Sequence, residues 1–181
     1  MKTKIFYIHG FGSSPQSDTL RKIQKVFPDA IGLTYDANDP VNSVILMRDE
    51  IERISAKEAC YPTIVGSSLG GWYAEQLTRH VVADFIMYNP ATSPETSLVK
   101  YGVPQAILYK YRILSGYALY KNPASRTVVL SMDDEVLDAA VVFSKYVEIS
   151  KIVKTSGGHR MTDQNMKIII DEIQYLENQL P

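Results

Sequence analysis

The chain has 181 residues, 45% of them hydrophobic, and its 19 basic and 20 acidic residues leave a formal net charge of −1 at pH 7. This length can bury a core as one domain over residues 1–181, and the single cysteine, Cys60, excludes an intrachain disulfide and a cysteine-built zinc site. The scattered basic residues argue against a nucleic-acid partner, and because no apolar run approaches the ~18–20 residues of a membrane span, we expect a cytoplasmic protein.

Short apolar segments alternate with segments of helical periodicity along the chain. The predicted strands are residues 5–8, 30–35, 63–65, 84–88, 127–131 and 148–153. Helices are expected after each of the first three strands, after the fifth, and at the C-terminus, and Cys60 is expected at the end of the second helix. Several strands are apolar without alternation, which is typical of a parallel sheet covered on both faces. The sequence therefore predicts an α/β fold of about six mainly parallel strands, with its ligand site beyond their carboxyl ends.

Residues 91–124 interrupt the alternation of strand-like and helical segments. They contain prolines 94, 104 and 123 and tyrosines 101, 109, 111, 117 and 120 among short apolar pieces. About 30 residues cannot build an independent core, so we expect a small, partly helical, lid-like insertion rather than a second domain. Its tyrosines either pack the insertion or form the wall of a substrate pocket.

The segment Gly66-Ser67-Ser68-Leu69-Gly70 follows an apolar strand and precedes a helical pattern. This is Gly-x-Ser-x-Gly, the pattern of a nucleophile elbow, in which a serine stands exposed on a sharp turn between a strand and a helix. Gly66 and Gly70 leave room for the chain to pass, and the start of the helix favours developing negative charge. Only Ser68 is centred between the two glycines, which makes it the candidate nucleophile.

An aliphatic hydroxyl needs an aligned base, and the chain offers three histidines. His9 precedes the serine, and we expect it to shape the loop after the first strand. His80 lies at the far end of the helix that follows the serine, roughly 18 Å away at 1.5 Å per residue. His159 follows the last strand on a loop that Gly157 and Gly158 loosen, so it can reach across the strand ends. The order serine, acid, histidine then favours His159 as the base.

The acid that orients the histidine is expected directly after the fifth strand, where Asp133 and Asp134 compete. Asp134 is favoured because Val136 and Leu137 can begin the next helix behind it. Nothing complements the acidic residues of this loop as a metal site, so no metal is expected. The backbone N–H groups of Phe11 and Leu69 are the candidate oxyanion donors, since one follows the first strand and the other follows the nucleophile.

Four segments resemble the small bacterial YqiA/YcfP-type esterase family of α/β-hydrolases: Tyr7–Pro15, Gly66–Ala74, Tyr88–Ala91 and Asp134–Leu137. The resemblance implies a minimal α/β-hydrolase without the usual first two strands. It also implies Ser68 as nucleophile, Asp134 as acid and His159 as base, with the oxyanion pair on Phe11 and Leu69. Met132-Asp133 stands where the family pattern has Thr-Gly, and residues 91–124 match no pattern that would define a substrate.

These observations predict a serine hydrolase that cleaves carboxylic esters or acyl thioesters through an acyl-enzyme on Ser68. No cofactor is expected, and the expected partner is a small acyl ester or thioester. The alternatives are a non-catalytic ligand-binding or scaffold protein on a hydrolase fold, and an enzyme of the peptidase or acyltransferase type. The sequence does not indicate the acyl chain length, the physiological substrate or the oligomeric state.

Overall fold

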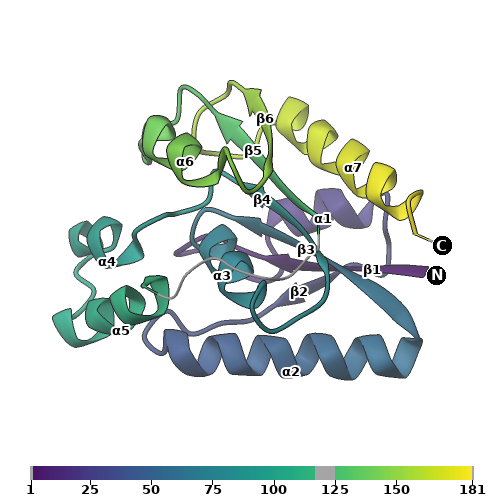
Figure 1. Ribbon diagram of the computed structural model, residues 1–181, viewed down its shortest axis with the longest axis horizontal. Coiled ribbons are helices and arrows are strands. Elements are labelled where there is room, and N and C mark those ends of the chain that lie inside the picture. The colour runs from purple at the N-terminus through teal and green to yellow at the C-terminus, as the bar shows by residue number, and fades with distance from the viewer. Residues whose placement is uncertain (1, 117–124, 181) are drawn as a thin grey trace.

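The computed structural model describes residues 2–116 and 125–180. Their centre is a six-stranded sheet in the order β2-β1-β3-β4-β5-β6, in which every neighbouring pair is parallel (Figure 1). The strands are β1 (Lys2–Ile8), β2 (Ile31–Leu33), β3 (Cys60–Ser67), β4 (Asp84–Tyr88), β5 (Arg126–Ser131) and β6 (Lys151–Thr155). The predicted parallel sheet is confirmed.

Helices cover both faces of this sheet, as predicted (Figure 1). One face packs against α1 and α7, and the other packs against α2, α3 and α6. These helices are α1 (Asp18–Gln24), α2 (Pro40–Glu58), α3 (Leu69–Leu77), α6 (Ala139–Tyr146) and α7 (Asp163–Glu177). Along β1, Phe6 and Ile8 join the core on the α2 and α3 side, whereas Ile5 and Tyr7 join the core on the α1 and α7 side. Burial on both faces explains why the strands read as continuous apolar runs.

Residues after β4 leave the sheet and form α4 (Pro94–Ser97), the 3₁₀ turn η1 (Val99–Tyr101) and α5 (Gln105–Ser115). Trp72 of α3 donates from Nε1 to Ser115 Oγ at 2.9 Å, and the fully buried Tyr111 donates to the carbonyl of Ala37 at 3.0 Å. The predicted insertion is thus helical in its first part and is attached to the main body by polar contacts in a buried interface. Two of the tyrosines for which packing or a pocket wall was predicted, Tyr117 and Tyr120, lie outside the described residues.

Several boundaries differ from the prediction. The strands β1 (Lys2–Ile8) and β3 (Cys60–Ser67) are longer than predicted, and β2 (Ile31–Leu33) is shorter. The sixth strand begins at Lys151 rather than Glu148, because the chain makes a turn after α6 in which Ile149 N–H donates to the Tyr146 carbonyl. Cys60 does not end a helix; Ala59 adopts a left-handed conformation that stops α2, and Cys60 begins β3.

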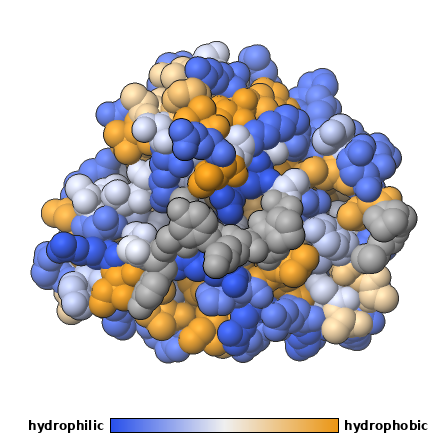
Figure 2. All heavy atoms as spheres, viewed as in Figure 1, coloured by the Kyte–Doolittle hydropathy of each residue, from blue (hydrophilic) through white to orange (hydrophobic). Residues whose placement is uncertain are grey.

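On the face viewed in Figure 2, several small groups of hydrophobic residues lie scattered among hydrophilic ones. In the part of the chain that the structure describes, no helix is both long and apolar enough to cross a membrane.

Candidate active site

Ser68 stands at the sharp turn between β3 and α3. Its backbone has φ 52° and ψ −118°, a left-handed conformation that side chains rarely adopt. Neighbouring chain holds this turn in place, since Ser68 N–H donates to the Tyr88 carbonyl and the Ser68 carbonyl accepts from Ala91 N–H, each at 3.0 Å. The elbow expected from the sequence therefore has the strained geometry that exposes a serine hydroxyl.

The two elbow glycines are required by close backbone approach. A Cβ on Gly66 would collide with the Gly70 carbonyl, and a Cβ on Gly70 would collide with the carbonyl oxygen of Ile8 in β1. Gly10 lies on the other side of the serine, where an added Cβ would stand 3.3 Å from Ser68 Cβ. The serine thus sits where two backbone segments pass closer than side chains would permit.

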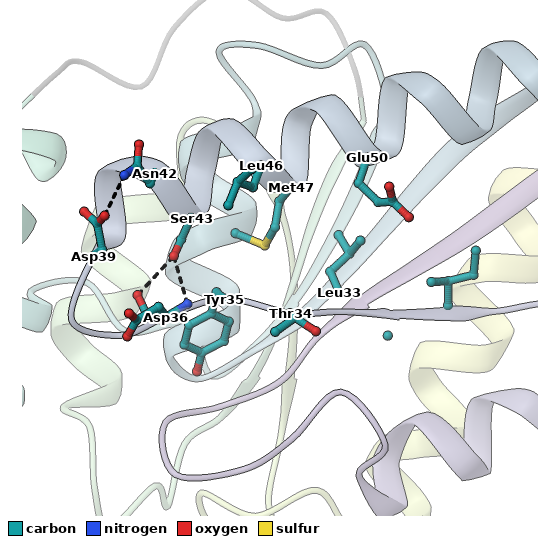
Figure 3. A pocket seen from close by; sticks show the side chains of 12 residues that line it. Leu33, Thr34, Tyr35, Asp36, Asp39, Asn42, Ser43, Leu46, Met47 and Glu50 are labelled. Carbon is teal, nitrogen blue, oxygen red and sulfur yellow. Dashed lines mark hydrogen bonds between the residues drawn. The ribbon is translucent and has the colours of Figure 1, made fainter.

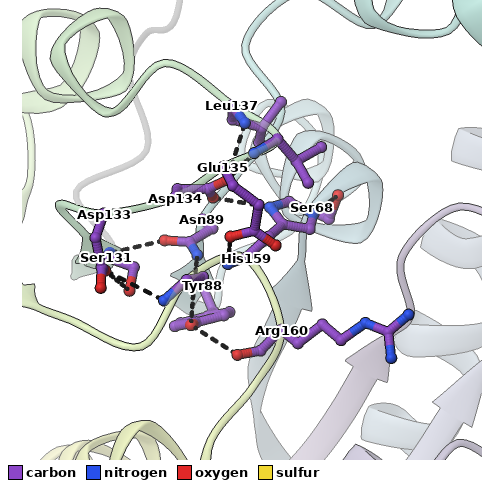
Figure 4. Close-up of polar contacts among 12 residues, drawn as sticks. Ser68, Tyr88, Asn89, Ser131, Asp133, Asp134, Glu135, Leu137, His159 and Arg160 are labelled. Carbon is purple, nitrogen blue, oxygen red and sulfur yellow. Dashed lines mark hydrogen bonds and ion pairs between the residues drawn. The ribbon is translucent and has the colours of Figure 1, made fainter.

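His159 bridges Ser68 and Asp134 (Figure 4). Its Nε2 lies 2.9 Å from Ser68 Oγ, and its Nδ1 lies 2.8 Å from Asp134 Oδ2. An ionised carboxylate only accepts hydrogen bonds, so Nδ1 carries the proton and Nε2 is left to accept from the serine hydroxyl. The structure brings these three side chains together from the ends of β3, β5 and β6.

Asp134 and the adjacent Asp133 hold different partners. Besides His159, Asp134 accepts through Oδ1 from the N–H groups of Val136 and Leu137, at 2.7 and 2.9 Å. Burial alone would raise the pKa of the Asp134 carboxyl, but the hydrogen bonds from His159, Leu137 and Val136 outweigh it and lower that pKa. The expectation that Val136 and Leu137 begin a helix is wrong: α6 begins at Ala139, because Asp138 caps it.

Asp133 instead fastens the loop that carries the histidine. Its carboxylate accepts from the N–H groups of Gly157 and Gly158 and from the Ser131 hydroxyl, and the two backbone bonds lower its pKa. Glu135 Oε2 accepts from His159 N–H at 2.9 Å. Three consecutive carboxylates therefore hold the ring and the backbone of one short loop.

Side chains at the end of β4 and on α7 also hold the loop that carries His159. Tyr88 donates to the carbonyls of Gly158 and Arg160, and Asn89 donates from Nδ2 to the Gly158 carbonyl. Asn165 donates to the Tyr88 hydroxyl at 3.0 Å. The sequence did not assign these supporting roles, although Tyr88-Asn89 ends a predicted strand and lies in one of the segments that resemble the esterase family.

The loop after β1 carries Phe11, the first candidate oxyanion donor. His9 Nδ1 and Ser13 N–H both donate to the Gly10 carbonyl, at 2.8 and 3.2 Å. In a planar trans peptide the next N–H points opposite to that carbonyl, so these bonds fix the direction of Phe11 N–H. His9 is buried and stacks on Tyr35 with ring centroids 4.5 Å apart, and burial lowers the pKa of its imidazole, which favours the neutral ring.

Two cavities meet at Ser68, and Phe11, His159 and Arg160 line both. The first, which we call the leucine-lined cavity, has a volume of about 330 Å³. Its walls come from the elbow, the insertion and the loop after β5, with the carbon side chains Leu69, Ala91, Leu98, Val136 and Leu137, the phenol ring of Tyr101, and the polar Ser97, Lys100 and Glu135. Tyr101 therefore lines a cavity beside Ser68, Tyr111 is buried in packing, and the exposed Tyr109 lines a separate hollow that Ser68 does not reach.

The second, which we call the hydroxyl-lined cavity, has a volume of about 390 Å³ and lies toward β1 and α1. Besides Ser68, its hydroxyl groups come from Tyr7, Ser13, Thr19, Ser67 and Tyr88. Leu69, the second candidate oxyanion donor, is the first residue of α3, where backbone N–H groups have no intrahelical acceptor.

A larger cavity of about 630 Å³ lies away from Ser68, between β2 and α2 (Figure 3). Polar residues along it bond to one another: Ser43 donates to the Asp36 carbonyl, and Asn42 donates to Asp39. The residues that line it contribute no histidine or cysteine. Within residues 2–116 and 125–180, no three His, Cys, Asp or Glu side chains lie close enough together to hold a metal ion.

The sequence profile of the uncharacterised protein family UPF0227 matches residues 4–174. The chain belongs to the UPF0227 family. A UPF0227 protein of Vibrio atlanticus is 26% identical over 171 residues, which cover 90% of this chain and 95% of the relative. The family expected from the sequence resemblance is confirmed.

The fold of this UPF0227 chain is that of the α/β hydrolases. Mouse alpha/beta hydrolase domain-containing protein 10 aligns with a TM-score of 0.72 at 17% identity, covering 98% of this chain and 90% of that one. An esterase of Pyrococcus furiosus aligns with a TM-score of 0.67 at 9% identity, covering 98% and 81%. At such identities the likeness concerns the fold.

Proposed function

We propose that this UPF0227 protein is a serine hydrolase that cleaves carboxylic esters or acyl thioesters through an acyl-enzyme on Ser68. The observation that carries the proposal is the chain of two hydrogen bonds from Ser68 through His159 to Asp134, 2.9 and 2.8 Å long. Ser68 also lines both cavities, so a bound ester can reach its hydroxyl.

In the acylation step, His159 Nε2 takes the proton of Ser68 as Oγ attacks the acyl carbon. The carbonyl π electrons move onto the substrate oxygen, and the N–H groups of Phe11 and Leu69 stabilise the oxyanion. Asp134 stabilises the imidazolium and holds its Nδ1–H. The oxyanion then collapses, the bond to the alcohol or thiol breaks, and His159 returns its proton to that leaving group.

In the deacylation step, water takes the place of the leaving group. His159 removes one water proton while the water oxygen attacks the acyl-enzyme, and the second oxyanion forms in the same place. Collapse releases the carboxylic acid, and His159 returns the proton to Ser68 Oγ. No step in this cycle draws on a cofactor or changes an oxidation state.

The esterase of Pyrococcus furiosus has the same fold, which is compatible with this chemistry but does not carry it, because one fold serves many functions. The site itself supports the proposal over a non-catalytic binding protein: a strained serine, an oriented histidine and a buried carboxylate acceptor are costly to hold together without use. The single domain over residues 1–181 belongs to the same proposal, with 91–124 as a lid-like insertion whose residues Leu98 and Tyr101 line the leucine-lined cavity.

A panel of p-nitrophenyl esters, acyl-coenzyme A thioesters and peptide amides tests the reaction class. We expect turnover of esters or thioesters that is lost in Ser68→Ala, with a burst of p-nitrophenol equal to the enzyme concentration if deacylation is slow. Turnover that survives Ser68→Ala would contradict the proposal. Cleavage of amides in preference to esters would move the protein to the peptidases.

A further inference from the structure

We propose that the hydroxyl-lined cavity binds the leaving alcohol and selects alcohols that carry a second hydroxyl group, with Tyr7 and Ser67 as the selecting residues. This inference rests on the proposed function, because it assigns one side of the ester to each cavity. It concerns residues next to the nucleophile that take no part in the proton transfers.

The key observation is a pair of hydroxyls beside Ser68. Tyr7 Oη and Ser67 Oγ lie 3.0 Å apart, and Tyr7 is only 2% exposed. One of the two donates to the other, so the accepting hydroxyl keeps a proton that has no acceptor among the residues the structure describes. Both residues line the hydroxyl-lined cavity, where this O–H can meet an oxygen of a bound molecule.

The other cavity suits the acyl group. The carbon side chains of Leu69, Ala91, Leu98, Val136 and Leu137 form one part of its wall, where burying a hydrocarbon chain is favourable, and the polar Ser97, Lys100 and Glu135 form another part. A polyhydroxylated alcohol in that position would lose hydrogen bonds to water at the carbon side chains. At about 330 and 390 Å³ the two cavities lie at the small end of ligand pockets, so each holds one side of a small ester.

His159 lines both cavities, so the leaving oxygen stays within its reach when the alcohol occupies the hydroxyl-lined side. The substrate class that follows is an apolar acyl ester of a small polyol, of which glycerol is the simplest. A site built to bond a substrate hydroxyl discriminates against the analogue that lacks it, because its own polar group is then left unpaired.

The test compares two esters with the same acyl group, glycerol monobutyrate and propyl butyrate, in wild type and in the double variant Tyr7→Phe/Ser67→Ala. Removing both hydroxyls together leaves no orphaned partner, so the variant is expected to fold. Wild type should favour the glycerol ester in kcat/KM. The double variant should lose about 2- to 12-fold of that preference, the value of one neutral hydrogen bond, mainly through KM for the glycerol ester.

The matched control is Tyr175→Phe, because Tyr175 is an exposed tyrosine on α7 and its variant should keep the wild-type preference. Equal kcat/KM for both esters in wild type, or an unchanged preference in the double variant, would overturn the inference and leave the serine hydrolase standing. A preference for ethyl 3-hydroxybutyrate over ethyl butyrate that the double variant abolishes would also overturn it, since the pair would then bind the acyl side. Failure to hydrolyse any of these esters would contradict both this inference and the ester specificity on which it rests.

Discussion

Replacing Asp134 by asparagine should remove nearly all activity without removing the side chain from its place. Oδ1 of Asp134 accepts two backbone N–H groups, so the amide oxygen of asparagine must occupy that position. The amide NH₂ then takes the Oδ2 position, 2.8 Å from His159 Nδ1. Two donors cannot bond to each other, so the ring adopts the tautomer in which Nδ1 accepts and Nε2 carries the proton. In that state His159 cannot accept the proton of Ser68.

The cost of this tautomer in a serine–histidine–aspartate site is about 10⁴-fold in kcat, which corresponds to about 5.5 kcal/mol. The assay is steady-state hydrolysis of the best p-nitrophenyl ester, with thermal unfolding to verify that the variant is folded. The matched control is Asp133→Asn, because Asp133 contacts the glycine N–H groups and not the ring. We expect the control to lose less than tenfold. Equal losses in the two variants, or an Asp134→Asn loss below tenfold, would refute the reasoning.

Three further predictions concern stability, pH and the oxyanion loop. Gly70→Ala should lower the free energy of unfolding by about 1–3 kcal/mol, because the added Cβ collides with a β1 carbonyl. In Gly116→Ala the added Cβ has ordinary contacts at 3.5 Å, so this control should stay within about 0.5 kcal/mol of wild type. Denaturant titrations measure both values. Hydrogen bonds lower the folded-state pKa of Asp133 below its ordinary 3.8, so the stability that this carboxylate contributes should be present above about pH 4 and lost below it. Between pH 6 and pH 2.5, the melting temperature of Asp133→Asn should therefore fall less steeply than that of wild type. Parallel falls of the two melting temperatures would contradict this prediction. His9→Phe keeps a ring against Tyr35 but removes the donor to the Gly10 carbonyl. In steady-state kinetics kcat should therefore fall about tenfold while KM changes little. An unchanged kcat would show that the loop keeps its orientation without His9.

The elbow was predictable because its constraints are local. Gly66 and Gly70 are spaced so that backbone can pass on both sides of one serine, and only Ser68 is centred between them. The parallel sheet was equally readable, since strands buried on both faces are continuous apolar runs. Both features follow from neighbouring residues, and the structure describes both where the sequence places them.

Asp133 and Asp134 show where sequence reasoning was limited. Two adjacent carboxylates on one loop have the same chemistry, and what separates them is the path of the β6–α7 loop. The sequence favoured Asp134 on the expectation of a helix at Val136, yet that segment is a turn whose N–H groups bond the Asp134 carboxylate. The preferred residue lies against His159, but for a different local reason.

Contacts between residues far apart in sequence were not predictable. Tyr88 and Asn89 hold the histidine loop across about 70 residues of chain, and nothing in their own neighbourhood indicates that role. The start of β6 was misplaced by three residues because Glu148–Ser150 fit a strand locally, whereas pairing with β5 begins at Lys151. Register of this kind is decided by the partner strand and not by the segment itself.

The central claim is that Ser68 becomes acylated, and trapping of the covalent intermediate tests it most directly. Wild-type protein treated with a fluorophosphonate should gain one adduct mass in intact-protein mass spectrometry, and fragmentation should locate it on Ser68 rather than on Ser67. Ser68→Ala should gain none under the same conditions. An adduct on another residue, or an unlabelled wild type while a control hydrolase is fully labelled, would contradict the account.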